Sequence, residues 1–523
     1  MFRAYCTAGS LDRASGGPVR AQTSSPGTPL RKRASVAAFS VWLCLAAPVA
    51  AQAPAAPQPA APAAPQPAAP APAEGASPSA PGAATSRGGL DRLAAELGQS
   101  GGLTARDAGR RAAQTSVQAE VDREKILLAK NDRDRVIWEA VPKLTFSGSL
   151  TRLSQVDAPT IVIPGMDPIP AFPPAPESTY MVNARLTVPF TDYLLRMVRA
   201  LNGAGSNERA ATLTEQATRV TVAANAKLYY YDWARARLAR VVAEQALEQA
   251  QAQLVRVQAM QAVGQAAEAD LQQALAFQAD AELVLAQSGT QQIVSEERLR
   301  MALHAEPGEA LRVGEDVLAA FDGAQEPRAL AELYQEADRQ RLELQALNHH
   351  RDAAEQVRAI EATRALPRLE GVGNFTYANP NPRVFPQEDK WAKSWDVGLS
   401  MIWSVTDLGT SGTAAEAARS QRDQLSLQRR QVQEQIYLEV ASAYHGLAQA
   451  RLSVGTAEQG ERAAVAAFKA RVQLEEQGMA TALELMLVQN AAVRARLNLI
   501  NAHIGLRVSR VQLDHALGRD TQL

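Results

Sequence analysis

The feature that most constrains this chain is that its sequence is built twice. Landmark residues recur 214 positions apart: Tyr230 with Tyr444, Gly264 with Gly478, and Leu303 with Leu517. Around them run long Ala- and Gln-rich stretches of helical pattern, and each copy is interrupted by two short segments of alternating polarity. A repeat of this kind sets the architecture before any local motif does. We therefore expect two copies of one unit, in the order helix, strand, strand, long helix and helix.

Four short segments alternate apolar and polar residues and are predicted to be strands: Leu144–Leu153, Tyr180–Phe190, Leu369–Tyr377 and Trp395–Trp403. Alternation places the two kinds of side chain on opposite faces of a sheet. Each segment has about 9–11 residues, the length of a tilted strand that crosses a bilayer, and aromatic residues lie near its ends, as in the girdles of membrane barrels. We expect Leu186 and Leu399 to face lipid, and Thr187 and Ser400 to face a water-filled lumen.

A soluble four-stranded sheet packed on helices is the alternative. The connections 156–179 and 378–394 argue against it, because they are rich in proline and carry almost no core-forming pattern, which is typical of exposed loops. Known bacterial barrels have at least about eight strands, and lipid does not tolerate an open sheet edge. Four strands cannot close a barrel, so the chain would have to pool its strands with those of other copies.

Residues 1–51 have the pattern of a signal peptide with an extended n-region. Three basic residues at 31–33 precede an apolar run at 34–47, and small residues suited to cleavage follow at 49–51. Both cysteines, Cys6 and Cys44, lie in this leader, so no disulfide is expected in the mature chain. The Pro- and Ala-rich residues that follow, 52–102, are expected to form a disordered periplasmic segment.

Long helical patterns flank the strands. Residues 103–140 end before Pro142, and 194–263 continue without proline; 329–366 and 413–477 repeat this arrangement in the second half. At 1.5 Å per residue, a helix of about 70 residues is about 105 Å long and projects as a rod or tube. Two apolar seams have coiled-coil spacing: Leu425, Val432, Ile436, Val440 and Leu447, and Leu497, Ile500, Ile504, Val508 and Val511.

These patterns divide the chain into a first repeat at 103–303, a connector at 304–328, a second repeat at 329–518 and a short tail at 519–523. The fold class is mainly α with a membrane β-barrel portion. Its helical part consists of long antiparallel hairpins, and each copy contributes four strands.

Residues that carry catalytic chemistry are not found in a recognisable pattern. The six histidines are scattered, and the adjacent His349 and His350 leave a helix about 100° apart, so they are not a chelating pair. The segment 371–373 has two glycines but lies in an alternating strand, where small residues favour packing rather than phosphate binding. A net charge of −1 gives no reason to expect a nucleic-acid partner. We expect no enzyme activity, cofactor, metal or nucleic acid.

The chain resembles the TolC-type outer-membrane efflux proteins over about 103–518. The double repeat carries this resemblance, with Val141-Pro142-Lys143-Leu144 and Leu366-Pro367-Arg368-Leu369 before the strands and Val263-Gly264-Gln265 and Gln477-Gly478-Met479 at the helix turns. It implies a homotrimer in outer-membrane lipid, with a shared twelve-stranded barrel and an α-barrel tunnel in the periplasm. It also implies docking of the hairpin turns at Gly264 and Gly478 on a periplasmic adaptor (membrane fusion) protein, coupled to an inner-membrane pump of the RND, ABC or MFS class.

Two acidic residues acquire a possible role through the resemblance. Asp270 follows Gly264 by six residues, and Glu484 follows Gly478 by six. Taken alone, each is an ordinary solvated helix charge, whereas the resemblance places both at the constricted periplasmic mouth, where their ring would favour cations.

Other mouth positions depart from the family pattern. A second acidic position of the family corresponds to Leu487, and a tyrosine/arginine latch pair aligns with Glu475 and Ala480. The sequence thus predicts a passive outer-membrane channel, the exit duct of a tripartite efflux pump or type I secretion system. A non-conducting periplasmic coiled-coil adaptor and an envelope scaffold with a plugged barrel remain alternatives.

Overall fold

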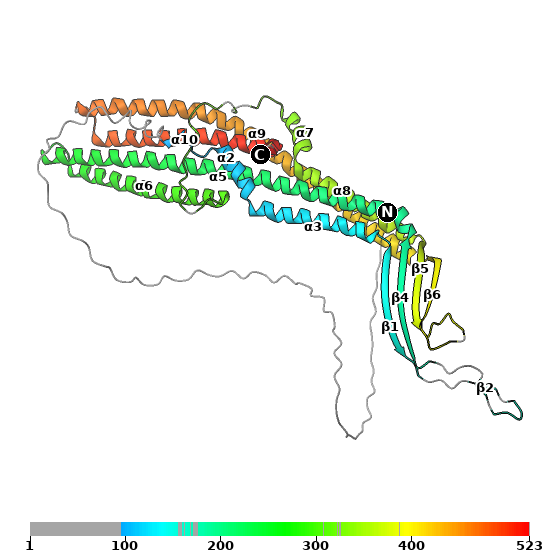
Figure 1. The fold of residues 1–523 in the computed structure, drawn as a ribbon. Helices are drawn as coiled ribbons and strands as arrows, with labels where there is room; N and C mark the ends of the chain where they lie inside the picture. Colours follow the sequence, from blue (N-terminus) through cyan, green and yellow to red (C-terminus); the bar gives the residue numbers. More distant parts are fainter. Residues whose placement is uncertain are drawn as a thin grey trace, which may run out of the picture. The chain divides into compact units, whose positions relative to one another are not determined.

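The computed structural model describes residues 96–521 except 155–158, 162, 168, 171–175, 307, 322, 324–325, 386 and 478. These residues belong to one compact unit that begins at Ala80 (Figure 1). The expected signal peptide and residues 52–95 of the expected disordered segment lie outside the described residues.

Each repeat consists of two helices, two strands and two longer helices. The first contains α2 (Ala105–Thr115), α3 (Val117–Glu139), β1 (Lys143–Arg152), β4 (Ser178–Pro189), the short α4 (Phe190–Leu195), α5 (Met197–Ala262) and α6 (Glu268–Leu303). The second contains α7 (Leu330–Gln340), α8 (Leu342–Ala362), the 3-10 helix η2 (Thr363–Ala365), β5 (Arg368–Asn379), β6 (Ala392–Ile402), α9 (Asp407–Glu476) and α10 (Ala482–Leu517), before the 3-10 helix η3 (Arg519–Thr521). A two-residue pairing of β2 (Thr160–Ile161) with β3 (Ile169–Pro170) lies in the first strand connection.

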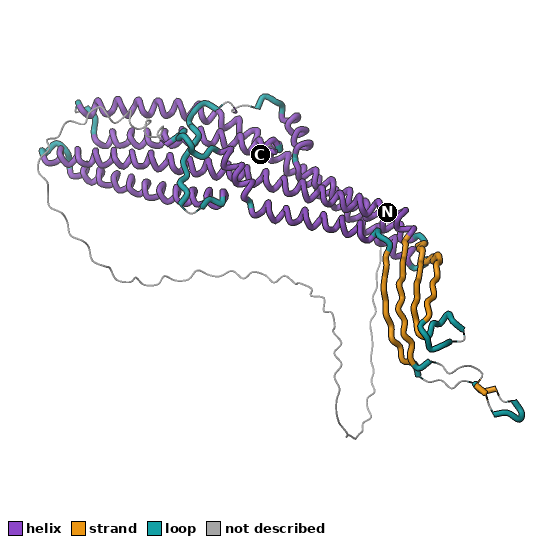
Figure 2. The backbone as a smooth tube through the Cα atoms, viewed as in Figure 1, coloured by secondary structure: helices purple, strands orange, loops and turns teal. Residues whose placement is uncertain are grey.

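The four long strands form one antiparallel sheet in the order β1-β4-β5-β6, which confirms the predicted strands to within a few residues at each end (Figure 2). The apolar face of this sheet is not packed on helices: Phe146 is 72% exposed and Leu399 is 73% exposed in the single chain. The sheet is therefore not packed on helices in the way that the soluble alternative required.

The helices beside the sheet lie side by side in the order α3, α5, α8, α9 (Figure 1). The 66-residue α5 and the 70-residue α9 continue beyond their neighbours, and their far portions pair with α6 and α10. Both long helices are about 100 Å in length at 1.5 Å per residue. The predicted long helical hairpins are therefore present.

Two predicted helices are each broken in two. We expected 103–140 and 329–366 to be continuous, but the backbone is extended at Ser116, with ψ 119°, and at Arg341, with ψ 116°. The Ser116 hydroxyl accepts a hydrogen bond from the Ala119 N–H and caps α3. Arg341 instead donates to the backbone carbonyls of His515 and Ala516 at the end of α10. No proline or glycine marks either break. The first is marked by the local Ser116 cap, whereas tertiary contacts of Arg341 with the end of α10 impose the second.

The core lies midway along the helices, where both repeats contribute apolar residues. One cluster surrounds the fully buried Trp233 and Leu303, and a second surrounds Ile436 and Leu517. Ile436, Val440 and Leu447 of one predicted seam are buried, and so are Ile500 and Ile504 of the other. The seams therefore pack as the heptad-like spacing predicts.

The end of the expected disordered segment and the expected connector both belong to this core. Residues 96–102 were assigned to the disordered segment, yet Leu97 is buried, and the Gln99 N–H donates to the Val313 carbonyl at 3.0 Å. The expected connector, 304–328, contributes Val313 and other buried side chains. A Cβ on Gly102 would come within 2.6 Å of the backbone of Gly314, so the two glycines allow these segments to meet. Charged and glycine-rich composition concealed this packing from sequence analysis.

Candidate functional site

The first helix-hairpin tip is closed by a glycine in the left-handed conformation. Gly264 has φ 76°, its N–H donates to the Gln261 carbonyl, and the Gln265 N–H donates to the Met260 carbonyl at 2.8 Å. This pair of bonds is the Schellman arrangement, which satisfies the free carbonyls at the end of α5.

The second tip closes in a related way. The Met479 N–H donates to the Leu474 carbonyl at 2.9 Å, the bond that corresponds to the one between Gln265 and Met260. Gly478, the predicted partner of Gly264, lies outside the described residues. The docking role of either turn remains a prediction.

Glu484 stands in the first turn of α10 and caps it. Its Oε2 accepts from the Thr481 N–H at 3.0 Å, and the Glu484 N–H donates to the Thr481 hydroxyl at 3.3 Å, which completes a capping box. The hydrogen bonds from Thr481 hold the pKa of the Glu484 carboxyl below its usual value. A guanidinium nitrogen of Arg471 lies 3.6 Å from the same carboxylate, so part of its charge is balanced within the chain.

Asp270 occupies the corresponding turn of α6 with fewer partners. Its Oδ2 accepts from the Ala267 N–H at 3.0 Å, but the alanine side chain has no oxygen with which to cap the helix in return. The sequence placed Asp270 and Glu484 together at one mouth. Both lie at the hairpin-tip end, but among the described residues no ion pair or hydrogen bond joins them. Whether they line an opening is untested.

The two hairpin tips contact each other through residues for which the sequence predicted no contact. Arg256 of α5 donates to Glu475 of α9 at 2.6 Å, and the Glu475 side chain is only 6% exposed. Beside it, Val257 packs with Ala274 and Met486 from the two shorter helices. The family latch position at Glu475 thus holds an ion pair within one chain. The two partners are 219 positions apart, so no local spacing could have revealed this pair.

The polar face of the sheet is organised in rows that cross all four strands. Pairing partners in adjacent strands share a face, and the register aligns Thr145, Arg185, Asn374 and Asp396 in one row. The next row towards the loops holds Ser147, Asn183, Thr376 and Ser394. The predicted inward residues Thr187 and Ser400 lie on this polar face, and Leu186 and Leu399 lie on the opposite one.

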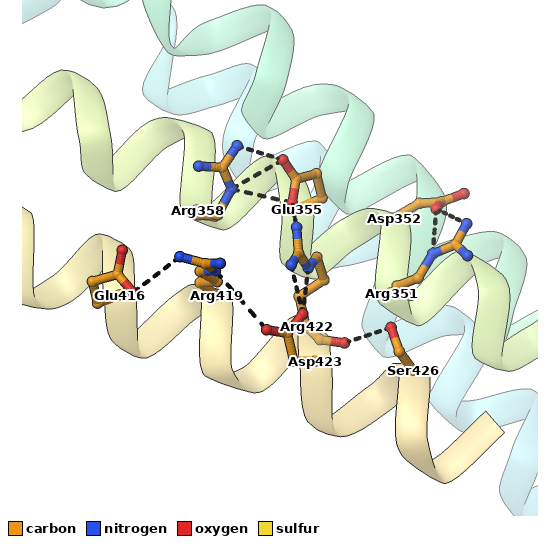
Figure 3. A network of polar contacts seen from close by, with 9 residues as sticks. All are labelled: Arg351, Asp352, Glu355, Arg358, Glu416, Arg419, Arg422, Asp423 and Ser426. Atoms are coloured by element: carbon orange, nitrogen blue, oxygen red, sulfur yellow. Dashed lines mark hydrogen bonds and ion pairs between the residues drawn. The ribbon is translucent and has the colours of Figure 1, made fainter. Parts of the chain in front are cut away.

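The helical wall near the sheet is held by charged contacts that differ between the repeats. In the first repeat, Arg133 of α3 donates to Glu208 of α5 at 2.9 Å. In the second, Glu355 of α8 accepts from Arg422 of α9 at 3.1 Å, so the signs are exchanged. Figure 3 shows that this second pair belongs to a larger network, in which Arg358 also donates to Glu355 and lowers the pKa of its carboxyl.

A groove of about 1020 Å³ lies beside these contacts, lined by α3, α5 and α8. Its lining includes Arg133, Glu208, Asp352 and Glu355 together with neutral polar side chains. Charges of both signs face it, and most are already paired, so the groove shows no preference for one class of ligand.

In the described part of the chain, no helix is both long and apolar enough to cross a membrane. Over the same residues, no three His, Cys, Asp or Glu side chains come together in a way that could hold a metal ion.

The second repeat matches the model of a known protein family. Residues 333–519 match the family model described as outer membrane efflux protein. A search of curated proteins finds no match.

Solved structures share the fold of about four fifths of the chain. The outer membrane protein VceC from Vibrio cholerae is 16% identical, with a TM-score of 0.66 over 79% of this chain and 96% of that one. The Campylobacter jejuni CmeC outer membrane channel is 14% identical, with a TM-score of 0.67 over 79% and 85%. The Neisseria gonorrhoeae MtrE outer membrane channel, solved in an open state, is 15% identical, with a TM-score of 0.66 over 80% and 91%.

Proposed function

We propose, from the confirmed resemblance to the TolC-type outer-membrane efflux proteins, that this chain is one subunit of a passive outer-membrane exit duct. Three copies would pool their strands in one twelve-stranded barrel, and their helices would form a tunnel in the periplasm. The observation that carries this proposal is a sheet with two open edges, an exposed apolar face and a polar face.

The open edges can join copies in a ring. Each of the three pairings in the sheet is antiparallel, so β1 and β6 also run antiparallel to each other. The β6 edge of one copy can therefore pair with the β1 edge of the next and continue the same ladder. Such a head-to-tail contact closes when the rotation per copy divides a full turn, and closure leaves no edge in lipid.

The two faces of the sheet suit opposite sides of such a barrel. Leu144, Phe146 and Leu399 lie on the apolar face, which lipid would cover. Thr145, Asn374 and Ser400 lie on the polar face, which would line water.

The helical wall also has two free sides, α3 and α9. Exposed apolar residues lie on both, among them Val121 and Leu128 of α3 and Leu427 and Leu438 of α9. Packing of α9 against α3 of the next copy would continue the wall in register with the sheet, since α3 leads into β1 and α9 follows β6.

Movement of solute through this duct would draw its energy from partners. We infer an adaptor that docks on the hairpin tips near Gly264 and an inner-membrane pump of the RND, ABC or MFS class. The family resemblance supports these partners and a passive channel without enzyme activity.

The test is to purify the chain from outer membranes in mild detergent and record it in planar bilayers. We expect a detergent-stable oligomer of three copies that conducts ions. A monodisperse monomer with folded strands would overturn the assembly. A stable oligomer without conductance would favour the plugged scaffold instead.

A further inference from the structure

The row of the sheet that holds Arg185 also holds Asp396, and these two are the charged strand residues in the middle of the polar face. Rows closer to the helices contain Lys143, Arg368 and Glu370, whereas the rows on the loop side, as far as Ser149, are neutral within the strands. In the middle row, Arg185 of β4 and Asp396 of β6 lie two strands apart, with Asn374 of β5 between them. Neighbouring strands are about 4.8 Å apart, so the two charges are separated by about 10 Å along the row.

The negative member of this row is already neutralised. Asp396 Oδ1 accepts from Arg383 at 2.8 Å, and Oδ2 accepts from the Asn374 amide at 2.8 Å. Arg383 comes from the β5–β6 connection and also donates to the Trp395 carbonyl.

The β5–β6 connection is itself fixed to the sheet. The Asn381 side chain is buried, donates to the Ala392 carbonyl and the Ser394 hydroxyl, and accepts from the Arg383 N–H at 2.9 Å. These contacts hold Arg383 in reach of Asp396. The carboxylate therefore faces two donors, and little of its charge is left for solute.

The positive member has no such partner. Across the residues that the structure describes, no acidic side chain lies within ion-pair distance of Arg185, whose side chain is exposed. Its row neighbours, Thr145 and Asn374, are neutral. Each copy thus presents one uncompensated guanidinium at a fixed level of the polar face.

We propose that Arg185 forms a cationic ring inside the barrel and makes it a site for anionic solutes, those that carry carboxylate, phosphate or sulfate groups. This inference rests on the proposed assembly, because only ring closure repeats Arg185 around an axis. Rings of arginine or lysine select anions in pores, and guanidinium groups match planar and tetrahedral oxyanions through paired N–H donors. Asp396 would otherwise cancel the ring, and Arg383 prevents this by pairing with it.

The experiment measures block of single channels by inorganic pyrophosphate. Protein is added on one side of the bilayer, and the strand loops then face the other side, to which pyrophosphate is added. The solution contains about 0.1 M KCl, at which charges are screened beyond about 10 Å. We expect wild-type channels to be blocked. Arg185→Gln should raise the half-blocking concentration by about tenfold or more, and Arg185→Lys should retain most of the block.

Lys393 supplies the matched control. It lies three positions before Asp396 in β6, so its side chain is on the apolar face. Lys393→Gln removes a positive charge at a similar level but outside the barrel, and it should leave the block unchanged. Detergent-stable oligomer must form equally in each variant.

The outcomes separate the two proposals. Conducting wild-type channels that pyrophosphate does not block, or equal block of wild type and Arg185→Gln, would overturn the anion site and leave the duct intact. An oligomer without conductance would overturn the duct and the ring together.

Discussion

The two repeats share one backbone plan but differ in the polar contacts that complete it. Both have a helix break before the sheet, at Ser116 and Arg341, and both end in a fully buried leucine, Leu303 and Leu517. Yet Ser116 caps its own helix, whereas Arg341 binds the carbonyls that end α10. The two repeats thus share apolar positions, because each repeat must fill an equivalent space in the core. Their hydrogen bonds and ion pairs differ.

The largest effects should come from breaking what the repeats share, the apolar sheet face. Leu186→Arg in the first repeat and Leu399→Arg in the second should each cost about 2–4 kcal/mol if the positions lie near the bilayer midplane. The measurement is the denaturant midpoint of the oligomer in lipid vesicles, together with its yield in outer membranes. Thr187→Arg and Ser400→Arg are the controls and should be tolerated. Equal losses on both faces would show that the assignment of the faces is wrong.

A smaller effect should appear at the helix caps, where the repeats differ. Thr481→Ala removes the side-chain cap of α10 and should cost about 1 kcal/mol, whereas Ala267→Thr supplies the missing cap of α6 and should gain about 0.5–1 kcal/mol. Amide hydrogen exchange in the first turn of each helix measures both changes. Thr481→Ser keeps the hydroxyl and should be nearly neutral. Faster amide exchange in the first turn of α6 in Ala267→Thr would contradict the expected gain in stability.

The exchanged ion pairs of the wall should give a still smaller effect. Exposed pairs contribute about 0.2–1 kcal/mol, so Arg133→Glu or Glu208→Arg alone should lower stability slightly, and the double variant should restore it. The same exchange of Glu355 and Arg422 should not, because the new arginine would face Arg358.

Double-mutant cycles from chemical unfolding would measure both couplings. Recovery in the second repeat as complete as in the first would show that the network around Glu355 adds nothing to the isolated pair.

The smallest effect on stability, but a change in conduction, is expected at the tip acids. Glu484→Gln keeps an oxygen that can accept from the Thr481 N–H, so the cap survives. It should nevertheless weaken cation preference and block by trivalent cations from the tip side. Asp270→Asn should act in the same way, and its effect should be larger per charge because Arg471 balances only Glu484. Unchanged selectivity in single-channel recordings of both variants would leave these acids as helix caps alone.

The sign of the pH dependence at Glu484 follows from its lowered pKa. A carboxyl whose folded-state pKa is depressed contributes stability that is present above the unfolded pKa, about 4.3 for glutamate, and is lost as the pH falls through the folded value. Its charge should therefore persist below the pH at which an ordinary glutamate is half protonated. Trivalent block that disappears well above that pH would contradict this.

The sequence predicts structure correctly where one physical rule acts over many residues. Period-two alternation fixed β4 and β6 and their faces, and heptad-like spacing identified Ile436 and Ile504 as core. The local conformation cannot be predicted where a single contact with a distant part of the chain determines it. The break at Arg341 depends on the end of α10, and residues 96–102 are ordered by the segment around Val313, far along the chain.

The candidate site divides in the same way. Asp270 and Glu484 could be found by their distance from a turn, and their place in the first turns of α6 and α10 is observed, although a shared mouth is untested. The Arg256–Glu475 pair could not be found, because its partners belong to different repeats. Nor could the row of Arg185, Asn374 and Asp396, which exists only once the strand register is known.

The two open edges of the sheet, β1 and β6, have a genetic consequence. If each subunit both offers and receives an edge, a subunit with one defective edge still binds a normal neighbour and then terminates the ring. Such a variant, for example one with proline in β6, would prevent ring closure in every assembly that contains it. Co-expression with the normal chain would therefore remove most channels, although half of the subunits were normal. Loss of both edges would be harmless to the normal copies, because that subunit would join no ring. A dominant phenotype from one edge and a recessive one from two is the inheritance pattern that an open sheet imposes.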